Sequence, residues 1–256
     1  MSAERRWGKS GASLLCCSSD YWFNQGVGQA QQSNHAGAIV SFSQALDFPP
    51  HRWQFYYCRG NSLYELRQFD EAIADYNKAI ELEPTVADIY YNRGNALYCL
   101  SQYDAAISDY YRCLSLDHKF ANAYVNRANA YFKKSQWGKA VVNYSKALTF
   151  FPSHGGVLFR RALAFVKANK TEEALADFAK VVSLEPGNDN AYYNRANLYY
   201  QLENFELAIA DYNQALRLNP DNTDAYYNKA MACLQLALFE ESRLAYKHCF
   251  ECSKNQ

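Results

Sequence analysis

Apolar residues recur along the chain at intervals of three and four, the spacing that gathers side chains on one face of an α-helix. The pattern is clearest in residues 87–120, where it runs twice and is interrupted near Ser101–Tyr103. The residues that share a face are Tyr90, Gly94 and Leu97 in the first stretch and Ala106, Tyr110 and Cys113 in the second. This segment is therefore predicted to be two helices joined by a tight turn.

The same pattern returns along the whole chain at one constant interval. A small residue stands at each step, at Gly26, Gly60, Gly94, Ala128, Ala162, Ala196 and Ala230. Another small residue follows each of these at a fixed distance, at Ala38, Ala72, Ala106, Ala140, Ala174, Ala208 and Ser242. Antiparallel helices approach closely only where no bulky side chain stands between them, so the two series mark the crossing point of each helix pair.

Seven such units account for all but the N-terminal end of the 256 residues. The predicted units are residues 19–52, 53–86, 87–120, 121–154, 155–188, 189–222 and 223–256, and residues 1–18 form an N-terminal extension that we expect to be disordered. All six prolines fall at unit ends, where they stop the second helix. The fifth unit opens with His154, Gly155 and Gly156, so we expect its first helix to begin late.

The repeat resembles the tetratricopeptide repeat family over residues 19–256. The resemblance rests on the small residues, on the aromatic residues Phe42, Tyr76, Tyr110, Tyr144, Phe178, Tyr212 and Tyr246, and on Ala45, Ala79, Ala147 and Ala215. It implies an all-α fold, a right-handed superhelical α-solenoid of antiparallel helix pairs. The first helices of the pairs would line a concave groove and the second helices would face outward.

Another face of the first helices carries a ring or apolar residue, an amide and a second ring at positions i, i+4 and i+7. The four copies are Tyr57, Asn61 and Tyr64; Tyr91, Asn95 and Tyr98; Val125, Asn129 and Phe132; and Tyr193, Asn197 and Tyr200. If the family geometry holds, this face lines the groove.

A second amide series lies three positions before the first, so the two series can meet between neighbouring units. Its members are Asn24, Asn92, Asn126, Asn194 and Asn228. An asparagine side chain offers one acceptor and two donors, which match the alternating N–H and C=O groups of an extended peptide. The series resembles the asparagine ladders of other tetratricopeptide superhelices, including the one attached to O-linked N-acetylglucosamine transferase. The alternative is that these amides only tie adjacent helices together.

The amide pattern breaks in the fifth unit, where Arg160 and Leu163 replace the two asparagines. Chaperone-binding members of the family hold a terminal carboxylate with two lysines, two asparagines and an arginine from three successive units. The resemblance matches three of these slots to Asn95, Asn126 and Arg160, whereas the lysine slots hold Tyr91 and Gly156. Lys133 and Lys167 can supply positive charge instead, favouring an acidic or carboxyl-terminal peptide. The alternative is a solvated basic surface.

Charged residues recur in two further series, which we expect to form salt bridges that fix the register of the helices rather than bind a ligand. The basic series is Arg59, Arg93, Arg127, Arg161, Arg195 and Lys229, and the acidic series is Asp75, Asp109, Asp177 and Asp211.

These patterns predict a non-enzymatic adaptor that binds an extended peptide segment of another protein. The alternatives are the substrate-targeting region of a separate transferase and a helical repeat that binds single-stranded nucleic acid. Charge disfavours nucleic acid, because 26 basic residues balance 26 acidic ones and Asp20, Asp88 and Asp224 occupy groove positions.

Other kinds of site have little support. The five histidines are scattered and suggest no nucleophile and base pair, so we expect no catalysis and no cofactor. Cys249 and Cys252, beside His248, lack a second pair at zinc spacing, so we expect no metal.

No apolar run is long enough to span a membrane, and we expect a cytoplasmic or nuclear protein without a membrane partner. The last helix either caps the array itself or forms a homodimer.

Overall fold

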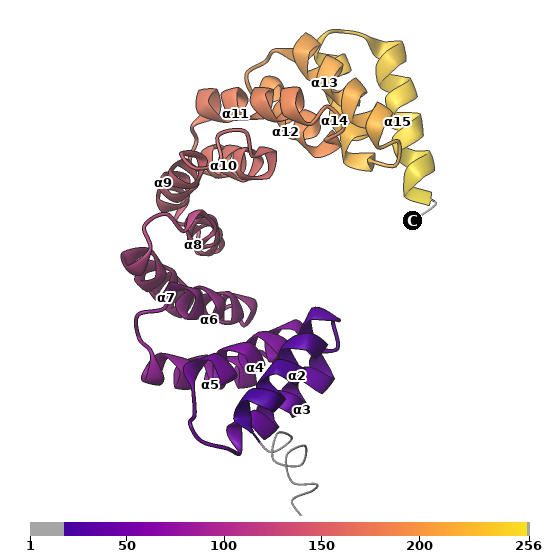
Figure 1. The fold of residues 1–256 in the computed structure, drawn as a ribbon. Coiled ribbons are helices and arrows are strands. Elements are labelled where there is room, and N and C mark those ends of the chain that lie inside the picture. Colours follow the sequence, from indigo (N-terminus) through magenta and orange to yellow (C-terminus); the bar gives the residue numbers. More distant parts are fainter. Residues whose placement is uncertain (1–17, 255–256) are drawn as a thin grey trace, which may run out of the picture. The chain divides into compact units, whose positions relative to one another are not determined.

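The computed structural model describes residues 18–254, and every regular element in that range is an α-helix (Figure 1). The predicted all-α helical-repeat fold is thus confirmed. The prediction for residues 1–18 falls almost entirely outside the described part. Ser18, the one described residue of that segment, caps the first helix by accepting a hydrogen bond from the backbone N–H of Tyr21.

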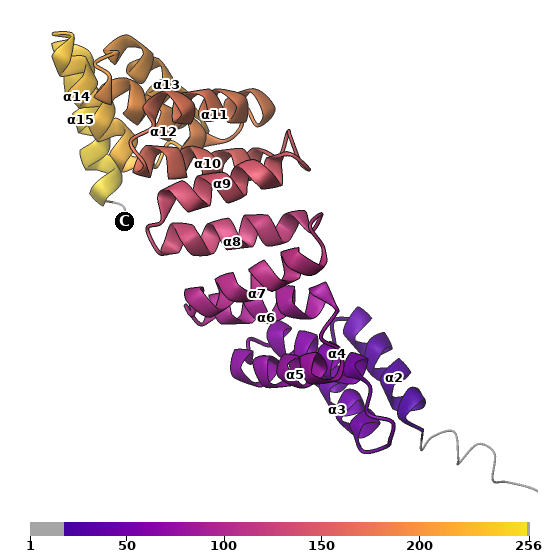
Figure 2. The same ribbon diagram turned by 90° about the vertical axis from the view of Figure 1, so that its left-hand side faces the viewer.

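The chain divides into two compact units, with the boundary between Lys134 and Ser135. The first contains α2 (Ser19–Gln31), α3 (His35–Leu46), α4 (Trp53–Glu65), α5 (Phe69–Leu82), α6 (Ala87–Cys99), α7 (Tyr103–Leu116) and α8 (Ala121–Lys133). The second contains α9 (Trp137–Leu148), α10 (Gly155–Lys167), α11 (Thr171–Leu184), α12 (Asp189–Gln201), α13 (Phe205–Leu218), α14 (Thr223–Gln235) and α15 (Phe239–Lys254). In each unit, consecutive helices pack side by side as hairpins, as α6 and α7 do in Figures 1 and 2.

The helices of the structure follow the constant period of the sequence. The first helices begin at residues 19, 53, 87, 121, 155, 189 and 223, and the second helices begin at residues 35, 69, 103, 137, 171, 205 and 239. The expectation of a late start in the fifth repeat is wrong, because α10 begins at Gly155. The His154 side chain caps this helix by accepting a hydrogen bond from the Val157 N–H. A Cβ at Gly155 would meet the carboxylate of Glu185, which is the end of an exposed side chain that can move aside.

Each hairpin turn holds one residue other than glycine in the left-handed backbone region. These residues are Ser33, Arg67, Ser101, Ser135, Asn169, Glu203 and Ala237, with φ between 56° and 62°. In the turn after α6 the N–H of Gln102 donates to the carbonyl of Leu97, and the N–H of Ser101 donates to that of Tyr98, both at 2.9 Å. These bonds satisfy carbonyls at the helix end that would otherwise lack a donor.

The crossing points of the hairpins fit the two series of small residues. Ala72 and Ala106 are fully buried, and a Cβ on Gly94 would lie 2.8 Å from Cε1 of Tyr110. Tyr110, itself 1% exposed, thus packs directly on the glycine backbone.

The predicted salt bridges form within the hairpins, between a first helix and its own second helix. The pairs are Arg59 with Asp75, Arg93 with Asp109, Arg161 with Asp177 and Arg195 with Asp211, at N–O distances of 2.6 to 2.7 Å. Each guanidinium donates to both carboxylate oxygens of its partner. The pairs are largely buried, and this fits the predicted structural role.

Candidate functional site

The two asparagine series meet between neighbouring repeats in the first unit, as predicted. Asn92 on α6 donates from Nδ2 to Oδ1 of Asn61 and to the hydroxyl oxygen of Tyr57 on α4, both at 3.0 Å. The hydroxyl of Tyr76 on α5 donates to the same Asn61 oxygen at 2.8 Å. One amide oxygen therefore links three helices from two repeats.

The same cluster of two tyrosines and two asparagines recurs twice in the described structure. The copies are Tyr91, Asn95, Tyr110 and Asn126 in the first unit, and Tyr193, Asn197, Tyr212 and Asn228 in the second. The alternative interpretation, that the amides tie helices together, is therefore correct for these atoms. It does not account for the whole of each side chain.

The outer aromatic residue matches the presence of an asparagine in the first series, except in the seventh repeat, where the hydroxyl of Tyr246 donates to the sulfur of Met231 at 2.9 Å. Where the second helix has a tyrosine, as in Tyr76, Tyr110 and Tyr212, its buried hydroxyl needs an acceptor and finds it on the asparagine. Where it has Phe42 or Phe178, the corresponding positions hold Val27 and Leu163. The first series is thus coupled to core packing as well as to the groove-facing surface.

Some amide atoms of these clusters have no partner within residues 18–254. Oδ1 of Asn61 and Oδ1 of Asn95 are occupied, but their Nδ2 groups have no hydrogen-bond partner. Both Nδ2 bonds of Asn92 are internal, but its Oδ1 has none. None of these three atoms is among the buried polar atoms that lack a partner, so all three reach solvent.

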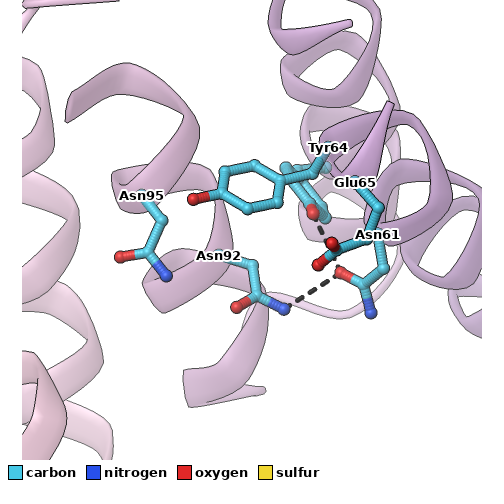
Figure 3. A pocket seen from close by; sticks show the side chains of 6 residues that line it. Asn61, Tyr64, Glu65, Asn92 and Asn95 are labelled. Atoms are coloured by element: carbon cyan, nitrogen blue, oxygen red, sulfur yellow. Dashed lines mark hydrogen bonds between the residues drawn. The ribbon is translucent and has the colours of Figure 1, made fainter. Parts of the chain in front are cut away.

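These free amide atoms line two adjoining pockets of the first unit. The pocket in Figure 3, about 310 Å³ in volume, is lined by Asn61, Tyr64, Glu65, Asn92 and Asn95 as well as Tyr76. The next pocket, about 390 Å³, shares Tyr64 and Asn95 with it and adds Tyr91, Tyr98, Cys99, Tyr110, Asn126 and Asn129. The predicted aromatic and amide-rich surface therefore exists in this unit.

Glu65 and Cys99 belong to this surface, although the sequence analysis did not single them out. They are the last residues of α4 and α6, and Lys133 is the last residue of α8. The sequence signal for Glu65 and Cys99 was their position, because they occupy the same place in their repeats as Lys133 and Lys167 do. From α4 through α6 to α8 this position changes from an acidic to a neutral to a basic side chain.

Asn194 departs from the predicted meeting of the two series. Its Nδ2 donates to the Asn190 carbonyl of its own helix at 2.7 Å rather than to the preceding repeat. The preceding repeat offers Phe159 and Leu163 at the positions of the tyrosine and the asparagine, and neither side chain has an acceptor. The break in the amide pattern therefore disconnects α12 from the network.

The remaining predicted site residues divide between the two units. In the first unit, Nδ2 of Asn129 lies 3.5 Å from Oδ1 of Asn126, and Lys133 is exposed at the end of α8. In the second unit, Arg160 and Lys167 are exposed on α10.

The described residues offer few other kinds of site. No group of three or more His, Cys, Asp and Glu side chains within residues 18–254 is arranged to hold a metal ion. No helix in that part of the chain has both the length and the apolar character needed to cross a membrane.

Family models match most of the repeat array. Models described as TPR repeat match residues 60–101 and 162–203, and models described as tetratricopeptide repeat match residues 87–120, 121–154, 190–222 and 211–243. The chain belongs to the tetratricopeptide repeat family. The family identified from the small and aromatic residues is thus confirmed.

Solved tetratricopeptide repeat structures share the fold. YrrB, described as a TPR protein with an unusual peptide-binding site, is 24% identical, with 73% of this chain and 97% of that chain covered and a TM-score of 0.67. The C-terminal part of a TPR repeat-containing protein from Cytophaga hutchinsonii is 18% identical, with 91% and 96% covered and a TM-score of 0.77. MamA from Desulfovibrio magneticus is 16% identical, with 68% and 98% covered and a TM-score of 0.64. No curated protein matches this chain significantly.

Alkaline pH is expected to destabilise the tyrosine and asparagine clusters. Burial raises the pKa of Tyr76, Tyr110 and Tyr212, so the fold favours the neutral hydroxyl. Their contribution is complete below the unfolded pKa of about 10 and is lost as the pH rises above it, by up to about 1.4 kcal/mol per pH unit for each tyrosine. The free energy of unfolding, measured in urea from about pH 7 to about pH 11.5, should fall accordingly.

A double variant isolates the contribution of one of these tyrosine hydroxyl groups to the pH dependence of stability. Tyr110→Phe with Asn95→Val reproduces the Phe42 and Val27 pair of the first repeat, so it should fold, and its stability should fall less steeply above about pH 10. Burial also raises the pKa of Cys113 to about 12, but this thiol is present in both proteins and does not enter the comparison. Equal slopes for the two proteins would contradict the assignment.

Proposed function

We propose that this chain is a non-enzymatic adaptor that holds an extended peptide segment of another protein on the amide-lined surface of its first unit. The observation that carries the proposal is the set of free amide atoms: Nδ2 of Asn61 and of Asn95 as donors, with Oδ1 of Asn92 as an acceptor between the two series. Extended backbone presents C=O and N–H groups in alternation, and such a surface can bond both without reading side chains.

The internal bonds of the cluster favour such binding. They fix the orientation of each amide, since Asn61 and Asn95 each accept two hydrogen bonds from the protein. A ligand therefore meets donors whose rotamers are already restricted, and little entropy is lost on binding. Each new hydrogen bond contributes about 0.5–1.5 kcal/mol, so several of them together with aromatic contacts give micromolar affinity.

Charge gives the segment a preferred composition. Lys133 is an exposed basic side chain at the end of α8 in the first unit, which favours an acidic or carboxyl-terminal residue of the segment near α8. Arg160 and Lys167 on α10 give the second unit, taken by itself, the same preference. The second unit carries one further cluster, around Tyr193, Asn197 and Asn228, with the same chemistry. A cytoplasmic or nuclear location and dimerisation through α15 stay predictions, as does the absence of nucleic-acid binding.

The proposal is tested by Asn95→Asp, which alters only the atom that faces solvent. Aspartate keeps an acceptor for the Tyr110 hydroxyl and for Nδ2 of Asn126, but replaces the free donor with a charged acceptor. A peptide carbonyl would then meet an oxygen instead of an N–H. Peptides selected on the wild-type chain from a random phage-displayed library should bind the variant at least about tenfold more weakly by fluorescence anisotropy.

The matched control is Asn77→Asp on the outer face of α5. Asn77 is exposed, and its Oδ1 accepts a hydrogen bond from Arg93. Aspartate at this position adds the same negative charge to the same unit as Asn95→Asp does. The Asn77→Asp variant should bind the peptides with an affinity within twofold of that of the wild type. The proposal fails if no peptide is enriched, or if the two variants bind equally.

A further inference from the structure

The first repeat lacks the amide pocket of its neighbours and has an apolar cavity instead. The cavity, about 360 Å³ in volume, lies among α2, α3 and α4. Its apolar walls are Val27 and Ala30 from α2, Phe42 from α3 and Cys58 from α4, and its rim includes Asn61 and Glu65. This volume is at the small end of the ~300–1,000 Å³ range of ligand pockets, which suits one large side chain rather than a whole cofactor.

The cavity is the first-repeat counterpart of the pocket in Figure 3, with small and apolar side chains at positions that hold a ring and amides in the second repeat. In the second and third repeats the ring of Tyr64 packs edge-on against Phe69 at 5.4 Å, and Tyr98 packs in the same way against Tyr103 at 5.3 Å. The corresponding residues of the first repeat are Ala30 and His35. The cavity therefore lacks the ring that lines the pocket of the next repeat, and its volume is about 360 Å³ against about 310 Å³.

The cavity continues into the amide-lined surface. Asn61 and Glu65 line both the cavity and the pocket shown in Figure 3, where their side chains lie next to each other. A peptide segment whose backbone reaches Asn61 can thus place one of its side chains in the cavity.

One polar group at the cavity restricts what it can bind. Glu65 is exposed, and the structure shows no ion pair for its carboxylate within residues 18–254. A basic residue beside the anchor would be paired there.

The thiol of Cys58 does not disturb the apolar character of the walls. Burial raises the pKa of Cys58 to about 11, so the thiol is neutral at physiological pH. It acts as a small apolar surface.

We infer that this cavity is an anchor pocket for one aromatic side chain of the bound segment, with a basic neighbour facing Glu65. The inference rests on the proposed peptide binding and adds a sequence requirement to it: the amides hold the backbone, and the missing ring of the first repeat selects an aromatic residue at one end. The partner is therefore an extended segment with an aromatic and a basic residue side by side.

The test uses the phage-selected peptides as probes against the full chain. Most of them should contain an aromatic residue next to Lys or Arg. Replacing that aromatic residue with alanine in the best synthetic peptide should weaken its binding to the wild-type protein at least about tenfold. A change below twofold overturns the inference, and this arm needs no variant of the protein to fold.

The protein variant Ala30→Tyr puts a ring on the wall of the cavity, as Tyr64 does in the pocket of the next repeat. It places a tyrosine against His35, in the arrangement that Tyr64 and Phe69 show, so the helical circular dichroism signal should be retained. The variant should bind the parent peptide about tenfold more weakly and should no longer distinguish it from the alanine peptide. Gly28→Tyr adds the same side chain to α2 at a position with open space around it and should bind as wild type does.

The remaining outcomes separate the two proposals. If the selected peptides are sensitive to Asn95→Asp but lack a common aromatic residue, the anchor is refuted and peptide binding stands. If no peptide is selected, both fail. If the wild-type chain self-associates in sedimentation without peptide and Ala30→Tyr abolishes this, a second copy occupies the cavity and the inference is overturned.

Discussion

Gly94→Leu is expected to destabilise the protein by about 3 kcal/mol. The first carbon of the new side chain would lie 2.8 Å from Cε1 of Tyr110. Tyr110 cannot move aside freely, since it is 1% exposed and its hydroxyl donates to Asn95 at 2.9 Å. The helices of the third hairpin would have to separate. The midpoint of thermal unfolding, followed by circular dichroism, measures the loss.

Gly28→Leu is the matched control, because nothing lies within 4 Å of a Cβ built on Gly28. Leucine is a better helix former than glycine, so this variant should be as stable as wild type or more stable, by up to about 1 kcal/mol. Gly94→Ala should cost much less than leucine, since Ala196 occupies the same position opposite Tyr212. Equal melting temperatures for the two leucine variants would refute the packing argument.

Asp109→Ala is expected to cost about 3 kcal/mol, at the low end of the range for breaking a buried ion pair. Both oxygens of Asp109 accept hydrogen bonds from Arg93, at 2.6 and 2.7 Å, and only 7% of the Asp109 side chain is exposed. Arg93 would remain between the two helices without its carboxylate. It keeps its bond to Asn77, and 23% of its side chain reaches solvent, which limits the cost. Urea unfolding at neutral pH measures the difference.

Removal of both charges tests whether the cost of Asp109→Ala comes from the charge that it leaves unpaired. The double variant Arg93→Met with Asp109→Leu should be more stable than Asp109→Ala alone, because no uncompensated charge stays buried. If the double variant is the less stable of the two, unpaired Arg93 does not destabilise the fold, and the structural interpretation must be revised.

The clusters of tyrosine and asparagine would couple stability to the proposed peptide binding. Asn95 accepts two internal bonds and still presents Nδ2 to solvent, so alanine at this position would leave the buried hydroxyl of Tyr110 without an acceptor. Such a variant would lose stability and binding together. Aspartate separates the two effects, because it retains the oxygen.

Several features of the fold followed from the sequence alone. The order and pairing of the described helices could be read from the repeat period, and the pairing of Arg93 with Asp109 from two charged series in phase. The late start expected for α10 was wrong, because the His154 cap outweighed the low helix propensity of glycine. Most of the left-handed turn residues carried no sequence signal, since none of them is glycine and Asn169 alone is of a type that favours this region.

The sequence by itself determined the repeat, the helix pairs and the positions of small, charged and amide side chains, because one local pattern recurs seven times and each copy packs on its own neighbours. Only the tertiary structure decided which end of each amide is occupied, that Asn194 turns back to its own helix, and that Val27 and Ala30 open a cavity beside Glu65. The reason is physical: a hydrogen bond or a cavity depends on what the facing helix offers, and the residues of the facing helix are distant along the chain.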